Sequence, residues 1–173
     1  MKSILLISLI FISTSIYSQE KSDDYKKMID SAITIKAAQL LNDYKQKLAK
    51  KNNTDNWKHY ISNYKELIEN IFLIDENHNP YVFSSSKELF EVKFKQLNIY
   101  DPTNKKRLKK GIDAWKIVCN LESNKMKIYI IDFKITYTNK IYEFSNGGGM
   151  TFIFEYSCEE KKWGIVSVKN NIL

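Results

Sequence analysis

The chain has 173 residues, of which 43% are hydrophobic, 13% aromatic and 27% charged, with only five glycines and two prolines. These fractions are typical of one globular domain and exclude a disordered, collagenous or low-complexity protein. Two cysteines also exclude a disulfide-dense mini-protein and a cysteine-rich zinc module.

The N-terminus has the three-part pattern of a secretory signal peptide. Lys2 provides a positive start, an apolar stretch covers residues 4–12, and small or polar residues continue to Ser18. The apolar stretch is far shorter than the roughly 20 residues that a membrane-spanning helix needs. We therefore expect export rather than membrane insertion.

Cleavage is expected after Ser18, or after Ser15, because Ile16 occupies a position where a small residue is preferred. The chain then consists of a signal peptide at residues 1–18 and one domain at residues 19–173. No cysteine stands at the new N-terminus to carry a lipid anchor. These features predict a soluble protein that is periplasmic or secreted.

The charge is basic but consists almost entirely of lysine. The net charge is +7, and it falls to +6 when Lys2 is removed. Arg107 is the only arginine, and the planar guanidinium is the group that best reads phosphates and guanine edges. Together with export, this composition predicts that nucleic acid is not a partner and that most of the basic charge is solvated.

Helical periodicity dominates the first half of the exported chain. Ser22 is a candidate N-cap, and apolar residues then recur at helical spacing to about Lys50. After a polar break, Thr54 or Asp55 is placed to cap a second helix, whose apolar stripe continues to Phe72.

Shorter elements are expected to follow this second helix, which ends near residues 77–80. The sequence predicts a short strand at residues 81–83. A third helix is then predicted from Ser86 to about Leu97, with Ser85 or Ser86 as its N-cap.

From Asp113 onward the apolar period changes to two, which indicates strands. Strands are expected at residues 115–121, 125–138, 150–158 and 163–169. Turns at residues 123–124 and 159–162 are expected to join the first pair and the last pair of these strands, and a glycine loop at residues 147–149 is expected to precede the third strand. In the longest strand the apolar phase slips between Ile130 and Ile131, a pattern typical of a β-bulge that bends the sheet.

Only one face of these strands is consistently apolar, so the upstream helices are expected to cover it. The predicted fold class is α+β, with N-terminal amphipathic helices packed on a curved antiparallel sheet formed by the C-terminal half.

This element order, together with the final hairpin at residues 156–168, resembles the cystatin-like cone of the nuclear transport factor two-like superfamily. The chain is also similar to small exported Bacteroidetes proteins of unknown function, in Gln19-Glu20, the segment 108–111 and the hairpin. That superfamily includes enzymes, ligand-binding domains and dimerisation modules. The resemblance therefore implies a fold and the location of a pocket rather than an activity.

Few residues carry a chemical motif. His59 and His78 have no zinc-ligand spacing, and residues 75–78 are explained by the end of a helix better than by metal binding. Residues 84–86 lack the glycine-flanked elbow of a hydrolase serine, and residues 147–149 fit a flexible loop better than a phosphate cradle. We therefore expect no metal and no cofactor.

Asp132 is the one candidate catalytic residue. If the first apolar phase of residues 125–138 persists, Asp132 faces the concave side of the sheet, where burial would raise the pKa of its carboxyl group. The bulge interpretation turns Asp132 outward instead. It is favoured because Ile131, Phe133 and Ile135 need burial.

The densest charge feature is the basic run at residues 105–110, between Pro102 and Gly111. One interpretation is a solvated loop, and the other is an electrostatic docking site for an acidic protein, glycan or lipid surface. The candidate binding residues are Lys105, Lys106, Arg107, Lys109 and Lys110.

Cys119 and Cys158 are expected to be free, buried thiols. If their strands flank the long central strand, the cysteines are two strand spacings apart, roughly 9–10 Å. A disulfide tolerates at most about 7 Å between Cα atoms.

Two functions remain open. The leading one is an exported, non-catalytic binding module, for example an immunity-type protein that binds a secreted toxin or another protein partner. The alternative is a small ligand-pocket protein or an enzyme of the cone fold that uses an acidic residue on the concave face. A deep pocket with an inward carboxylate would favour the alternative. The oligomeric state stays open, a homodimer included.

Overall fold

The computed structural model describes residues 2–50, 54–84 and 91–171, and for residues 2–22 it describes the backbone alone. The elements in chain order are α1 (Lys2–Ala49), α2 (Asp55–Glu69), β1 (Ile71–Ile74), β2 (Phe94–Lys95), a 3-10 turn (Pro102–Asn104), α3 (Lys105–Leu108), β3 (Ile112–Glu122), β4 (Lys125–Thr138), β5 (Ile141–Ser157) and β6 (Lys162–Asn171). The predicted α+β class is confirmed.

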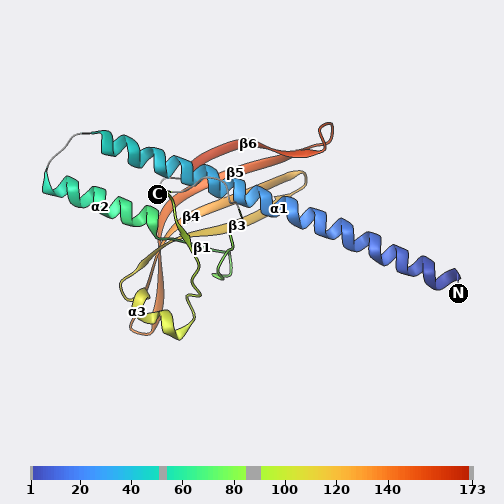
Figure 1. The fold of residues 1–173 in the computed structure, drawn as a ribbon, viewed down its shortest axis with the longest axis horizontal. Coiled ribbons are helices and arrows are strands. Elements are labelled where there is room, and N and C mark those ends of the chain that lie inside the picture. The colour runs from blue at the N-terminus through green and yellow to red at the C-terminus, as the bar shows by residue number, and fades with distance from the viewer. Residues whose placement is uncertain (1, 51–53, 85–90, 172–173) are drawn as a thin grey trace.

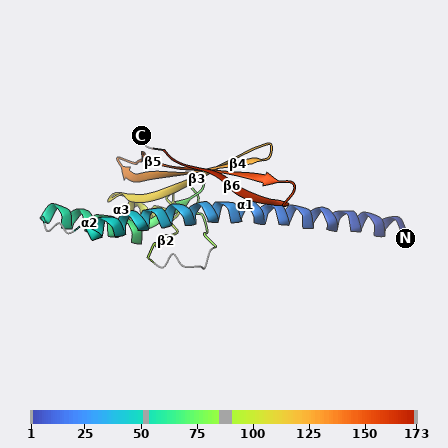
Figure 2. The ribbon, with the colours of Figure 1, turned by 90° about the horizontal axis from the view of Figure 1, so that it is seen from above.

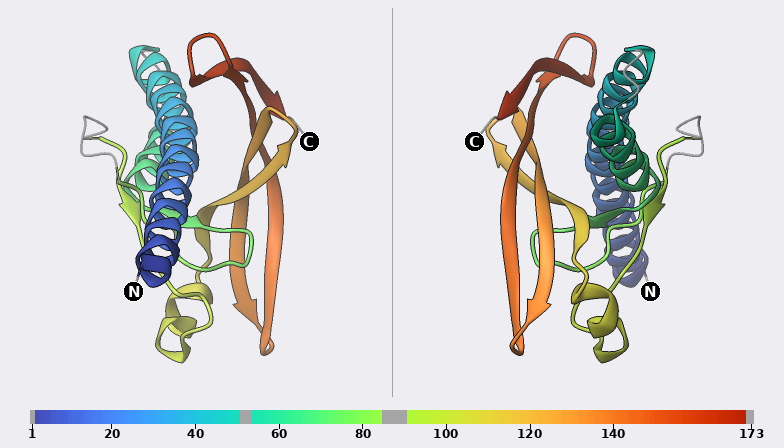
Figure 3. Two further views of the ribbon diagram at one scale, coloured as in Figure 1. Left: turned by 90° about the vertical axis from the view of Figure 1, so that its right-hand side faces the viewer. Right: turned by 90° about the vertical axis from the view of Figure 1, so that its left-hand side faces the viewer.

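The six strands form one mixed sheet in the order β2-β1-β3-β4-β5-β6. Strand β1 is parallel to both of its neighbours, and β3 to β6 are antiparallel. The sheet curls into a half-barrel around α1, with β2 on one side of the helix and β5 and β6 on the other (Figure 3). Figures 1 and 2 show that α1 crosses this sheet and that its N-terminal part extends well beyond it.

A hydrophobic cluster fills the space between α1 and the concave face of the sheet. Its fully buried members include Ala32 and Ile33 on α1, Ile71 on β1, Ile128 on β4 and Phe152 on β5. The apolar stripe of α1 and the alternating residues of the strands therefore meet as the sequence predicts.

A second cluster lies on the other face of the sheet. Ile74, Ile112 and Ile135 are buried there beneath Ile99 and Leu108, which belong to the segment that crosses this face before β3. The prediction that only one face is apolar is therefore wrong. This second layer explains both apolar phases of β4, because even-numbered residues up to 130 face α1 whereas residues 133 and 135 face the second cluster.

The irregularity predicted near Asp132 is present, but the extra residue belongs to β5. The flanking pairs are Ile131–Gly149 and Phe133–Asn146. Asp132 thus lies opposite two residues, Gly147 and Gly148, while its own strand pairs with β3 without interruption. This arrangement is a β-bulge on β5.

Residues 147–149 are consequently part of a continuous strand, and the prediction of a hairpin loop there is wrong. The chain turns instead at Asn139 and Lys140, whose φ angles are 54° and 66°. Positive φ at both central residues is typical of a two-residue hairpin, and it matches the twist of the flanking strands.

The second helix is shorter than predicted, because α2 ends at Glu69 and residues 71–74 form β1. All four residues of β1 are buried. A continuous apolar run is typical of a strand with both faces covered, and it can mimic the end of an apolar helical stripe.

The predicted strand at residues 81–83 is absent. The Tyr81 backbone N–H donates to the Leu73 carbonyl oxygen at 2.9 Å, and the Tyr81 hydroxyl donates to Asp30 at the same distance, so this segment is tied to β1 and α1 without forming a ladder. The start of the predicted third helix falls on residues 85–90, outside the described residues. From residue 91 onward the helix prediction is wrong, because Phe94–Lys95 is β2.

Other predictions are confirmed. The Thr54 side chain caps α2 by accepting from the Trp57 backbone N–H at 3.3 Å, and a two-residue turn at Ser123 and Asn124 joins β3 to β4. Ser22 lies inside α1, so the prediction that it is an N-cap is wrong. Within the described ranges, no helix is long and apolar enough to cross a membrane.

The two cysteines are free, but only Cys119 lies on a strand, β3, whereas Cys158 lies in the turn directly after β5. Burial raises the pKa of the Cys119 thiol to about 11, whereas Cys158 is exposed, so the prediction that both are buried is wrong.

A thiol reagent at pH 8 should modify Cys158 rapidly and Cys119 only after denaturation, because the thiolate is the reactive species. Mass spectrometry should show one early adduct, which Cys158→Ser removes. Two adducts forming at equal rates would contradict this assignment.

Candidate functional site

Asp132 points toward α1. Its Oδ2 accepts a hydrogen bond from the Lys36 ammonium at 2.9 Å. The outward orientation that the sequence favoured is wrong, because the side-chain alternation of β4 continues unbroken through the bulge. The alternative that placed Asp132 on the concave face describes its position correctly.

Lys36 is the only charged side chain that is buried in the part of the chain the structure describes, with 7% exposure. Its ammonium lies 4.9 Å from the ring centroid of Trp115, which is the direct neighbour of Asp132 across the β3–β4 pair. The ion pair and the aromatic face together offset part of the cost of removing this charge from water. The Asp132 side chain is 38% exposed, so its carboxylate remains accessible.

A pocket of about 560 Å³, which we call the concave pocket, opens beside this ion pair, between α1 and strands β4, β5 and β6. The polar side chains that line it, besides Lys36 and Asp132, are Gln39, Asp43, Asn146, Asn170 and Asn171. Gly147 and Gly149 of the bulge also line it, so the bulge that bends β5 contributes directly to this pocket.

The first four residues of the basic run form the short helix α3, which the fully buried Leu108 anchors, and Lys109 and Lys110 lie in the turn that follows. The Lys105 ammonium lies 5.2 Å from the Tyr137 ring centroid, and the Arg107 guanidinium lies 4.7 Å from that of Phe72. Lys105 is partly exposed, and the other four cations, Lys106, Arg107, Lys109 and Lys110, are exposed.

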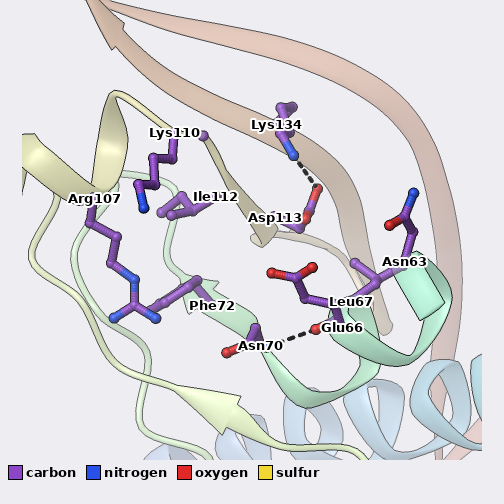
Figure 4. A pocket seen from close by; sticks show the side chains of 11 residues that line it. Asn63, Glu66, Leu67, Asn70, Phe72, Arg107, Lys110, Ile112, Asp113 and Lys134 are labelled. Carbon is purple, nitrogen blue, oxygen red and sulfur yellow. Dashed lines mark hydrogen bonds and ion pairs between the residues drawn. The ribbon is translucent and has the colours of Figure 1, made fainter. Parts of the chain in front are cut away.

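Two of the five cations of the run also line a pocket. Arg107 and Lys110 line a second pocket, of about 500 Å³, which is shown in Figure 4. Docking of an acidic partner on the run stays a prediction.

The candidate metal ligands at residues 75–78 have other roles. The Asp75 carboxylate accepts two backbone hydrogen bonds within its own turn, at 2.8 and 2.9 Å. The His78 ring stacks on Phe144 at 4.5 Å, and burial together with the Lys116 ammonium lowers the pKa of His78. No group of three or more His, Cys, Asp or Glu side chains among the described residues is arranged to hold a metal ion.

Ser84 and His59 line neither pocket. Ser84 donates its backbone N–H to Asp30 at 3.3 Å, whereas Ser85 and Ser86 lie outside the described residues. His59 is exposed on α2, where its ring contacts Asn63 at 3.2 Å.

Lys36 is the functional candidate that the sequence analysis missed. It stands among apolar positions of α1, between Ile33 and Leu40, where the helical period demands a buried residue. A lone lysine inside an apolar stripe is the signal that identifies it, because buried lysines need a partner.

No protein-family model, no curated protein and no solved structure matches this chain.

Proposed function

We propose that this protein is a ligand-binding domain whose concave pocket takes a small, neutral, hydroxyl-rich molecule such as a monosaccharide or disaccharide. The observation that supports this proposal most is the inward carboxylate of Asp132, held by Lys36 at the pocket wall. A buried ion pair adds little stability compared with well-packed apolar residues, and paired charges in a cleft are typical of functional sites.

The lining of the pocket fits hydroxyl groups, which both donate and accept hydrogen bonds. Asp43 and Asp132 offer acceptors, and the amides of Gln39, Asn146 and the two asparagines at the end of β6 offer both donors and acceptors. The charges of Lys36, Asp43 and Asp132 sum to −1, which disfavours anions. The pocket volume falls within the usual range for small-molecule sites.

The pocket supports binding better than catalysis. Lys36 already occupies one oxygen of Asp132, and the other polar side chains of the lining are mostly amides, which are neither nucleophiles nor bases. An inward carboxylate in a pocket is also the feature that separates a ligand-pocket protein from a module that only docks another protein.

Two further parts of the proposal concern fold and location. The half-barrel around α1, with a pocket on its concave side, supports assignment to the cystatin-like cone of the nuclear transport factor two-like superfamily. Export to the periplasm or the medium is supported by the pattern of residues 1–18.

Replacing Asp132 with asparagine should weaken sugar binding by about tenfold or more, because a hydrogen bond to a charged group contributes about 1.5–3 kcal/mol. Calorimetric titrations with glucose, N-acetylglucosamine and maltose as probes measure this effect. Asp113→Asn is the matched control, since Asp113 lies on the neighbouring strand and pairs with Lys134 instead of lining the concave pocket. Equal binding by the wild type and Asp132→Asn would contradict the proposal.

A further inference from the structure

The second pocket lies where the end of α2 meets the turn between α3 and β3. Its lining combines Leu67 and Ile112 with charged side chains from α2, α3, β3, β4 and the turn between α3 and β3. Gly111 makes the turn possible, because its φ is +79° and an added Cβ would lie 2.8 Å from Cε of Lys134. The Lys134 side chain can therefore pass directly over this turn.

Three charges in this pocket have no ionic partner among the described residues. Lys134 is paired with Asp113 at 3.6 Å, and both belong to the lining. Arg107, Lys110 and Glu66 form no ion pair within the described part of the chain. Figure 4 shows Arg107 and Lys110 on one side, with the Glu66 carboxylate reaching toward the middle from α2.

The position of Arg107 is fixed from two directions. Leu108, the next residue, is fully buried and anchors α3, while the guanidinium lies 4.7 Å from the Phe72 ring centroid. A guanidinium held over an aromatic ring keeps its edge free for a carboxylate, which it can bind with two parallel hydrogen bonds. Less side-chain entropy is then lost when an anion binds.

The unpaired charges therefore set the chemistry of the occupant. Two cations on one side and one carboxylate on the other complement a ligand with two carboxylates and one ammonium group. Leu67 and Ile112 provide apolar surface for a short methylene chain between them. We propose that this pocket, which is separate from the concave pocket, binds an acidic α-amino acid, with Arg107 and Lys110 on its carboxylates and Glu66 on its ammonium group.

Titration calorimetry on the full chain at low ionic strength tests this site, with L-glutamate, L-glutamine and glutarate as probes. L-Glutamate should bind in a saturable manner, and the two probes that lack one charged group should each bind about tenfold more weakly. Salt should weaken all binding, because the charges are near the surface.

Variants assign each charge to its role. Glu66→Gln should abolish the preference for L-glutamate over glutarate, whereas Arg107→Gln should weaken both probes by about tenfold or more. Lys106→Gln is the matched control, because it removes the same charge from the same helix without lining the pocket. Asp132→Asn should leave L-glutamate binding unchanged, which distinguishes this site from the concave pocket.

Three results would overturn the inference. Absence of saturable L-glutamate binding would remove the site. Glutarate binding as tightly as L-glutamate would show a plain anion site without recognition of the ammonium group. Equal losses in Lys106→Gln and Arg107→Gln would show that only the general positive field of α3 matters.

Discussion

Gly149→Ala should lower the free energy of unfolding by about 3 kcal/mol or more. Gly149 has a φ of +152°, and a Cβ at this position would lie 2.4 Å from the Ile130 carbonyl oxygen and 2.9 Å from the Ile131 Cα. Both contacts are with backbone atoms of β4, which cannot rotate away as the end of a flexible side chain can. Backbone strain and overpacking each cost about 1–3 kcal/mol, and here they act together.

Gly164→Ala is the control for this substitution. Gly164 lies on β6, and nothing is within 4 Å of the Cβ that alanine would add. Its unfolding free energy should stay within about 1 kcal/mol of the wild type. Urea unfolding of the three proteins measures the difference, and similar losses at both glycines would mean that β4 and β5 do not approach as closely as described at the bulge.

Lys36 and Asp132 should be strongly coupled in their effect on stability, and the two single substitutions should lower the free energy of unfolding by different amounts. Asp132→Val leaves the buried Lys36 ammonium without its partner and should destabilise the protein by about 3 kcal/mol. Lys36→Met leaves Asp132, whose partly exposed carboxylate can bind water, so the loss should be nearer 1 kcal/mol. The double variant should lie close to the wild type, since it buries no unpaired charge.

A double-mutant cycle by urea unfolding measures this coupling. Additive losses from the two substitutions would mean that the ion pair does not exist in solution. If the double variant is stable but no longer binds the sugar probes, the pair serves the pocket rather than the fold.

The β3–β4 hairpin could be predicted from the sequence, whereas the equally local turn of the β4–β5 hairpin at Asn139 and Lys140 was not predicted. The bounds of β4 follow from its alternation and from the two-residue turn at Ser123 and Asn124. Residue type and position narrow the cap of α2 to Thr54 or Asp55, and the structure shows that it is Thr54. Such features depend on neighbouring residues only, so a single sequence contains them.

The sequence did not predict features that depend on packing between segments far apart in the chain. Residues 71–74 continue the apolar stripe of α2, and only their position between two covered faces makes them a strand. The prediction that Asp132 points outward was wrong for the same reason. Phe133 and Ile135 are covered by the segment before β3, and the sequence alone does not place that segment against the sheet. Without that second layer, a phase slip in β4 was the simplest explanation of its two apolar faces.

The proposed ligand site is the concave pocket beside Lys36 and Asp132. The most direct measurement is an NMR titration of isotope-labelled protein with glucose, N-acetylglucosamine and maltose. Signals from Gln39, Asn146 and the asparagines at the end of β6 should shift in a saturable manner, while those from Asn63 and Asn70 in the second pocket should not. Saturable shifts confined to the second pocket, or no saturable shift with any of the three sugars, would contradict the claim.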